Sequence, residues 1–318
     1  MNRVAEHAAT TPTRYCEVGD VRYAYRELRP DNAVDRTPVL FLHRFRGTLD
    51  DWDPLFVDEL AKTRHIVLFS DQEVGSSTGM AATSVDEKAR NAAAFARALG
   101  HSAIDVLGFS MGGFVCQAIA LREPELVRKV VLIGTGPGGN PESAPPTDIV
   151  FDIALHPQYS FEDVRYLFFA EGRDRETRAY IDRRASRTSG QERVVTPEVI
   201  SKMVTLIGDF MQGRTGHFER LKDLHQPVLI VAGDRDPFFP LKNMWILYRE
   251  LPNAQLSVFP QAGHGPHQQH PIEVAAQVEH FLAAPKHLQV VFRVRLRCAQ
   301  WLVRRGMRLP IGRPLPRR

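Results

Sequence analysis

Short uninterrupted apolar runs recur along the chain and alternate with helix-like segments. The runs lack the polar and apolar alternation of a strand with one face in water, which is typical of strands buried on both faces of a parallel sheet. Strands separated by helical crossovers form an α/β fold, and right-handed crossovers place helices on both faces. We therefore predict a doubly wound, mostly parallel sheet with strands at 38–42, 65–69, 104–107, 130–133, 228–232 and 255–259.

Helix signals occupy the intervals between these runs. Asp53 and Pro54 form a favourable pair of N-cap and first helical residue. Ser84 and Glu87 have the spacing of a capping box, and Gly100 follows as a stop signal. The expected elements are helices at 53–61, 84–99, 111–122, 241–250 and 271–282, and an antiparallel hairpin at 15–28.

The interval between Gly134 and Pro227 breaks this rhythm. It has no convincing strand pattern, but it contains helix-like patches such as FEDVRYLFFA and TPEVISKMVTLIGDFM. A structureless loop of this length is unusual in a compact domain. We therefore predict an α/β core formed by 1–139 and 223–284, a helical cap inserted at 140–222, and a C-terminal tail at 285–318.

Charge is distributed unevenly between the body and the tail. Residues 286–318 carry Lys286 and nine arginines without an acidic residue, whereas residues 1–285 hold 31 basic and 37 acidic side chains. The basic pI of the whole chain therefore does not indicate a nucleic-acid partner. The tail is compatible with a disordered segment, with a segment that folds on a protein partner, or with a helix on an anionic membrane surface.

Targeting and redox signals point to the cytoplasm. No apolar stretch reaches the roughly 18 residues of a membrane span, and the N-terminus lacks the apolar region of a secretory signal. Cys16, Cys116 and Cys298 are widely spaced, so they predict reduced thiols and offer no metal-ligand cluster. We expect a cytoplasmic protein without a metal or cofactor, with peripheral membrane contact through the tail as a further possibility.

A G-x-S-x-G pentapeptide, Gly108 to Gly112, stands between an apolar run and a helix-like stretch. Small residues on both sides let the backbone turn sharply and lift the Ser110 hydroxyl above the end of a strand. The following helix then points its N-terminal amides at negative charge that develops on a substrate there. The pattern alone arises by chance often enough that the rest of the chain has to support it.

Two later loops carry the partners that a nucleophilic serine needs. One follows the strand at 228–232 and reads GDRDPFFP, and the other follows the strand at 255–259 and reads PQAGHG. With these motifs in the order serine, aspartate, histidine, the chain resembles the α/β-hydrolase superfamily over about residues 15–283. The resemblance is to its serine branch, which includes small esterases and non-haem haloperoxidases. It implies Ser110 as nucleophile, His264 as general base and Asp236 as the acid that orients the base.

Other residues in the same loops compete for these roles. Asp234 is the alternative acid, although the family places its carboxylate at the second aspartate of the loop. His267 and His270 are alternative bases, but His264 directly follows Ala-Gly at a strand end, which favours it.

The oxyanion site is implied by the same resemblance. It assigns the backbone N–H groups of Met111 and Phe45 to the site. The sequence departs from the family here, because Arg44 stands where glycine is usual, and Glu73 lies in an eroded turn motif at 69–76. Arg44 could crowd the turn, or it could add positive charge near the site.

The leading hypothesis is a serine hydrolase that needs no cofactor. It would cleave a carboxylic ester, thioester or lactone of a small, apolar acyl substrate through an acyl-serine intermediate. One alternative is perhydrolysis of the non-haem haloperoxidase type with the same triad. The other is a non-catalytic binding or regulatory protein in which Arg44 and Glu73 have spoiled the active-site loops.

Overall fold

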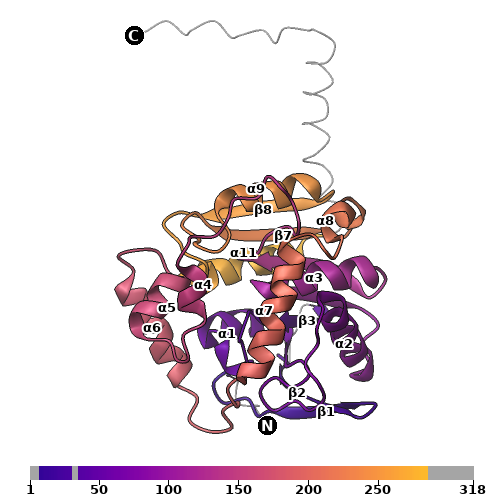
Figure 1. Ribbon diagram of the computed structural model, residues 1–318. Coiled ribbons are helices and arrows are strands. Elements are labelled where there is room, and N and C mark those ends of the chain that lie inside the picture. The colour runs from indigo at the N-terminus through magenta and orange to yellow at the C-terminus, as the bar shows by residue number, and fades with distance from the viewer. Residues whose placement is uncertain (1–6, 31–34, 286–318) are drawn as a thin grey trace, which may run out of the picture. The chain divides into compact units, whose positions relative to one another are not determined.

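The structure is a computed structural model that describes residues 7–30 and 35–285. Its centre is one eight-stranded sheet with the strand order β1-β2-β4-β3-β5-β6-β7-β8 (Figure 1). The strands are β1 (Arg14–Val18), β2 (Val21–Leu28), β3 (Asp35–Leu42), β4 (Arg64–Phe69), β5 (Ile104–Phe109), β6 (Val127–Ile133), β7 (Val228–Gly233) and β8 (Ala254–Phe259). From β4 to β8 all neighbours are parallel, while β1 and β2 form an antiparallel hairpin that joins the edge of β4. The predicted sheet is confirmed.

Two layers of helices cover the sheet. The helices of the core are α1 (Pro54–Ala61), α2 (Val85–Ala98), α3 (Met111–Arg122), α9 (Leu241–Glu250) and α11 (Pro271–Ala283). Alternate strand residues point to opposite faces. Leu40, Val106 and Val130 pack with residues of α2, α3 and α9 on one face, and Phe41, Leu107 and Val131 pack with residues of α1 and α11 on the other. The buried runs of the sequence are therefore core on both sides.

Side-chain caps start the helices on either side of β4. Asp53 accepts a hydrogen bond from Leu55 N–H, with Pro54 at the first position of α1. Ser84 accepts from Glu87 N–H, but the Glu87 carboxylate receives Thr83 N–H rather than the N–H of the cap residue. The predicted capping box is therefore half formed, because the carboxylate reaches one residue further back.

All regular elements between β6 and β7 are helices. It contains α4 (Val150–Ala154), α5 (Phe161–Phe168), α6 (Asp174–Ala185), α7 (Pro197–Met211), α8 (His217–Arg220) and the 3₁₀ turn η2 (Leu221–Asp223). Residues 134–227, all of which the structure describes, include no strand. In Figure 1, α5 and α6 lie together at one side of the molecule, while α7 crosses in front of the sheet. We call the segment 140–222 the cap.

Ion pairs and aromatic packing tie the cap to the core. Arg183 on α6 makes a bidentate ion pair with Asp53, with nitrogen to oxygen distances of 2.8 and 2.6 Å. On α7, Phe210 stacks on Phe114 of α3, with ring centroids 4.1 Å apart. Both contacts use residues that adjoin the ends of β5 and of the loop after β3, so the cap covers the carboxyl edge of the sheet.

The described residues bear on the prediction about membrane spans but do not include the tail. Within residues 7–30 and 35–285, no helix combines the length and the apolar character needed to cross a bilayer. The basic tail at 286–318 lies outside the described residues, and with it the three alternatives of a disordered segment, a segment folded on a protein partner and a helix on a membrane surface.

Candidate active site

Ser110 sits on a strained turn between β5 and α3. Its backbone has φ 55° and ψ −119°, a region that non-glycine residues rarely adopt. A Cβ at Gly112 would lie 2.0 Å from the carbonyl oxygen of Leu42, and a Cβ at Gly108 would lie 2.3 Å from that of Gly112. The flanking glycines are therefore required by close backbone approach, as the pentapeptide suggested.

The turn is fixed by backbone hydrogen bonds and presents the serine to a cavity. Ser110 N–H donates to Ile133 O at 2.9 Å, and Gly113 N–H donates to Ser110 O at 2.8 Å. The side chain lines the wall of the cavity described below, where the residue is 8% exposed. The hydroxyl makes no hydrogen bond to His264 in the described residues, and such contacts are often loose before substrate binds.

His264 and Asp236 form a buried pair at the ends of β8 and β7. His264 Nδ1 lies 2.9 Å from Asp236 Oδ2, and both side chains are at most 2% exposed. The other carboxylate oxygen, Oδ1, accepts hydrogen bonds from Phe238 N–H and Phe239 N–H at 2.8 and 3.0 Å. Asp236 Oδ2 therefore faces Nδ1 of the His264 ring. The Nε2 atom of that ring is left for another partner.

The competing residues lie elsewhere. The carboxylate of Asp234 accepts Ala262 N–H at 3.4 Å and does not reach a histidine. Both ring nitrogens of His267 are buried without a partner among the described residues, and burial lowers the pKa of this ring to about 3. His270 stacks on Phe259, outside the cavity. The structure thus brings Asp236 and His264 together and leaves the alternatives apart.

Aromatic rings enclose the imidazole of His264. The centroids of Phe238 and Phe109 lie 4.5 and 4.9 Å from it, and Phe239 and Phe168 stack at 5.8 and 6.2 Å. A ring held in this way has little freedom to rotate. A charge that forms on it is shielded from water, which strengthens its interaction with Asp236.

The two residues assigned to an oxyanion site border the same cavity as Ser110. Met111 is the first residue of α3, so its N–H has no acceptor within the helix. Phe45, in the loop after β3, donates no backbone hydrogen bond within the described part of the chain. Both residues line the cavity. Two free donors therefore lie close to the serine, one of them at the positive end of a helix.

Arg44 fits its turn without strain. Arg44 does not have a positive φ, so this position does not require glycine. The guanidinium is bound to Asp51 Oδ1 at 2.6 Å and to the carbonyl oxygen of Phe45 at 2.7 Å, and it lies over the Phe168 ring at 4.9 Å. Of the two effects considered for Arg44, crowding does not occur, and a positive charge is present at the wall of the cavity.

A carboxylate behind the oxyanion loop holds this arginine in place. Burial alone would raise the pKa of Asp51, but Arg184 of the cap and Arg44 outweigh it and hold that pKa well below its usual range. The Thr48 N–H also donates to Asp51, at 2.8 Å. Asp51 thereby completes the capping box of the 3₁₀ turn η1 (Leu49–Asp51), and its ion pair with Arg184 of α6 is a contact that no sequence signal indicated.

Glu73 does not reach the serine cavity. It adopts φ 60°, and its carboxylate accepts Ala81 N–H at 2.8 Å and Lys202 of α7 at 3.2 Å. The same loop receives the cap again where Ser76 N–H donates to Glu192 at 2.6 Å. The eroded turn motif is therefore a docking site for the cap, a role that no sequence signal indicated.

The cavity itself has a volume of about 470 Å³ and lies between the core and the cap. Ser110, His264, Phe45 and Met111 line it from the core. The cap supplies most of the remaining wall, which is apolar and includes Phe151, Leu155, Tyr159, Leu167, Ile207 and Met211. The sequence alone does not identify these lining residues, because their positions depend on how the short helices of the cap pack.

Comparison with known proteins identifies the family. A model of the alpha/beta hydrolase fold matches residues 37–271. The chain belongs to the α/β-hydrolase fold family. An α/β-hydrolase fold protein from Chitinophaga pinensis has a solved structure that is similar to the present one, with a TM-score of 0.78 and 30% sequence identity over 88% of this chain and 100% of that chain.

Similar curated proteins include a hydrolase and a bifunctional protein. A 2-hydroxy-6-oxononadienedioate/2-hydroxy-6-oxononatrienedioate hydrolase from Burkholderia vietnamiensis is 26% identical over 89% of this chain and 99% of its own length. A biotin biosynthesis bifunctional protein from Teredinibacter turnerae is 23% identical over 89% of this chain, which spans 50% of that protein. The chain thus covers half the length of the bifunctional relative. Together, the family and its named hydrolases establish an enzyme of the α/β-hydrolase type.

Proposed function

We propose that this α/β-hydrolase cleaves a carboxylic ester, thioester or lactone through an acyl-serine intermediate. The observation that carries the proposal is that Ser110 and His264 line one apolar cavity, with His264 paired to Asp236 behind it. A serine hydroxyl needs a base to become a nucleophile, and the base needs a carboxylate to fix its tautomer. The three residues supply these groups.

The chemistry proceeds in two halves. Ser110 Oγ attacks the carbonyl carbon while His264 Nε2 takes its proton, and Asp236 stabilises the resulting imidazolium through Nδ1. The N–H groups of Phe45 and Met111 bind the oxyanion. His264 then returns the proton to the leaving oxygen or sulfur, which departs and leaves the acyl group on Ser110. A water molecule activated by His264 hydrolyses this acyl-serine and restores the hydroxyl.

The wall of the cavity favours an uncharged, apolar substrate. Its polar side chains are few, namely Arg44, Ser110, Tyr159, Gln212 and His264, and Arg44 is already paired with Asp51. A volume of about 470 Å³ suits a small ligand. The relative from Burkholderia vietnamiensis carries a dicarboxylate in its name, whereas burying two carboxylates against these rings would be costly. We therefore propose medium-length or aromatic acyl groups as substrates.

A fluorophosphonate probe tests the mechanism directly. The wild-type protein is expected to become labelled at Ser110, and Ser110→Ala to lose the label completely. Ser201→Ala is the matched control, because Ser201 is exposed on α7 and should leave labelling unchanged. Absence of labelling in well-folded wild-type protein would contradict the proposal and favour a non-catalytic binding protein.

Acyl-chain profiling tests the proposed substrate class. With p-nitrophenyl esters of increasing acyl length, kcat/KM should rise by about fourfold for each methylene buried, until the cavity is full. Ile207→Trp places a larger side chain on the α7 wall and narrows the cavity. It should shift the preferred acyl length to shorter chains. A preference for charged dicarboxylic esters would contradict the proposed class without affecting the mechanism.

The last proposals concern the location of the protein and its partners. We propose a cytoplasmic protein that acts on a small molecule, and the composition and the widely spaced cysteines support this. Peripheral membrane contact through 286–318 can be tested by co-sedimentation of the full chain and of a 1–285 variant with anionic liposomes. Equal sedimentation of the two would exclude a role of the tail.

A further inference from the structure

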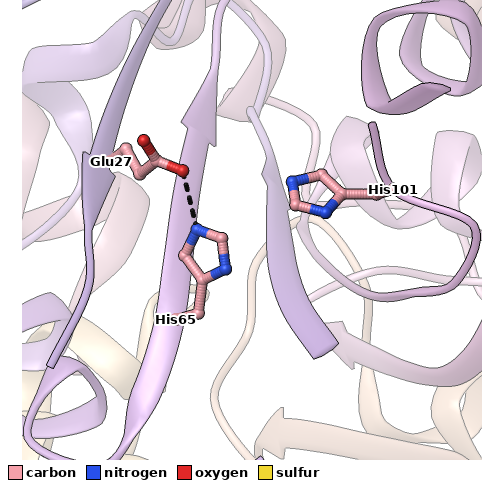
Figure 2. A group of neighbouring side chains, drawn as sticks. All are labelled: Glu27, His65 and His101. Atoms are coloured by element: carbon pink, nitrogen blue, oxygen red, sulfur yellow. Dashed lines mark hydrogen bonds and ion pairs between the residues drawn. The ribbon is translucent and has the colours of Figure 1, made fainter. Parts of the chain in front are cut away.

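A second cluster of potentially reactive side chains lies at the opposite edge of the sheet from Ser110. Glu27 is near the end of β2, His65 is at the start of β4, and His101 lies between α2 and β5 (Figure 2). β5 leads from this edge to the serine, so its length separates the two sites by roughly 20 Å. One ligand atom of each residue lies within 4.8 Å of those of the other two. Three elements therefore converge on one small volume.

The polar atoms of this cluster are incompletely satisfied. His65 Nε2 lies 2.8 Å from Glu27 Oε1 and 3.2 Å from the Nε of Arg29. One imidazole nitrogen can donate to the carboxylate or accept from the guanidinium, but it cannot do both. His101 Nε2 is buried without a hydrogen-bond partner among the described residues. An unpaired buried nitrogen costs free energy, so it needs a specific explanation.

We propose that Glu27, His65 and His101 form a binding site for a zinc ion. Two imidazole nitrogens and one carboxylate oxygen are a donor set that Zn²⁺ prefers, with a fourth position open to water. Ligands bound at about 2.0–2.2 Å lie roughly 3.3–3.6 Å from one another in a tetrahedron. The ligand atoms lie within 4.8 Å of one another, so closing the site has to bring them together by about 1 Å. The expectation of a protein without a metal rested on the wide spacing of the cysteines, and none of them belongs to this cluster.

Two arginines compete with the metal for the carboxylate. Arg14 Nη1 binds Glu27 Oε2 at 3.0 Å, and Arg29 Nη2 binds Glu27 Oε1 at 2.6 Å. The side chain of Arg29 is 57% exposed, so it can turn into solvent and free Oε1. Arg14 can remain on the other oxygen and orient the carboxylate, in the way that neighbouring groups orient metal ligands elsewhere. Zinc and Arg29 thus bind the same oxygen alternately.

The test is zinc titration of the full-length protein after treatment with EDTA and dialysis. Calorimetry with ZnCl₂ should show one site per chain, and Co²⁺ should give the visible bands of a tetrahedral site. His101→Phe keeps the ring volume, breaks no side-chain hydrogen bond at Nε2, and should weaken binding by at least tenfold. His280→Phe, which changes an exposed histidine on α11 outside the cluster, should bind as wild type.

Arg29→Ala separates a metal site from a purely structural cluster. Removing the competing guanidinium should tighten zinc binding several-fold, whereas a structural cluster would only lose stability. At a 100-fold excess over Kd, zinc should raise the Tm of wild type by about 5 °C and leave that of His101→Phe unchanged. No binding by folded wild type, or equal binding by wild type and His101→Phe, would overturn the proposal.

Discussion

Two buried pairs of histidine and carboxylate lie at opposite edges of one sheet. Their central distances are nearly equal, 2.9 Å for His264 and Asp236 and 2.8 Å for His65 and Glu27. Their surroundings differ. The second oxygen of Asp236 is held by two backbone amides, whereas both oxygens of Glu27 face arginines. The hydrogen bond alone therefore does not define the chemistry of such a pair.

The two histidines differ in the groups that lie beside the ring on the side away from the carboxylate. His264 faces an apolar cavity with Ser110 and two free backbone donors. His65 faces a guanidinium and a second histidine. A base beside a nucleophile can transfer a proton, whereas a base beside another imidazole offers a second lone pair to a cation. The following predictions probe this contrast, from the largest expected effect to the smallest.

Removing the acid of the first pair should have the largest effect. Asp236→Asn should lower kcat/KM for an ester by about 10³–10⁴, because His264 loses the partner that fixes its tautomer and stabilises its charge. Asp234→Asn is the matched control and should stay within a few-fold of wild type. If Asp234→Asn showed the larger loss in steady-state assays, the acid would be misassigned.

Arg44 should have an intermediate effect. Arg44→Ala removes the hydrogen bond that fixes the Phe45 carbonyl, so the oxyanion loop loosens and kcat/KM should fall by about tenfold. Arg184→Ala breaks the other ion pair of Asp51 without touching Phe45. It should lower stability similarly, by about 1–3 kcal/mol in urea unfolding, and leave kcat/KM close to wild type. Equal kinetic losses in both variants would assign the effect to Asp51.

Changing the second pair should affect stability and leave catalysis intact. Glu27→Gln removes a carboxylate shared by two arginines, and we expect a loss of about 1–3 kcal/mol in the free energy of unfolding at pH 7. Glu17→Gln on β1 is the control for the loss of a negative charge. A large fall in kcat/KM for Glu27→Gln would mean that the two edges are coupled.

The pH dependence of stability should also distinguish Glu27→Gln from wild type. The pKa of Glu27 is lowered to about 2 in the folded protein, below the unfolded value near 4.3. Its contribution is therefore complete above the unfolded pKa and is lost as the pH falls toward 2. Wild type should lose stability more steeply than Glu27→Gln between pH 5 and pH 3. Parallel curves in urea titrations would contradict this role of the pair.

The catalytic side of this comparison was accessible from the sequence. Strand ends and motif order are local signals that place the three loops at one edge, and the resemblance to the α/β-hydrolases implies Ser110, Asp236 and His264 as the candidates within them. Glu27, His65 and His101 have no motif spacing, and only the strand order β2-β4-β3-β5 brings them together. The anchoring of Arg44 on Asp51 depends in the same way on packing between distant segments.

Asp51 has a consequence for how substrate reaches the cavity. It binds Arg44 of the oxyanion loop and Arg184 of cap helix α6 at the same time, at 2.6 and 2.7 Å. Any motion that lifts α6 has to break the second ion pair and leave a buried carboxylate with one cation fewer. Opening of the cap at α6 therefore costs free energy at Asp51, while the ion pair with Arg44 can keep the loop after β3 in place.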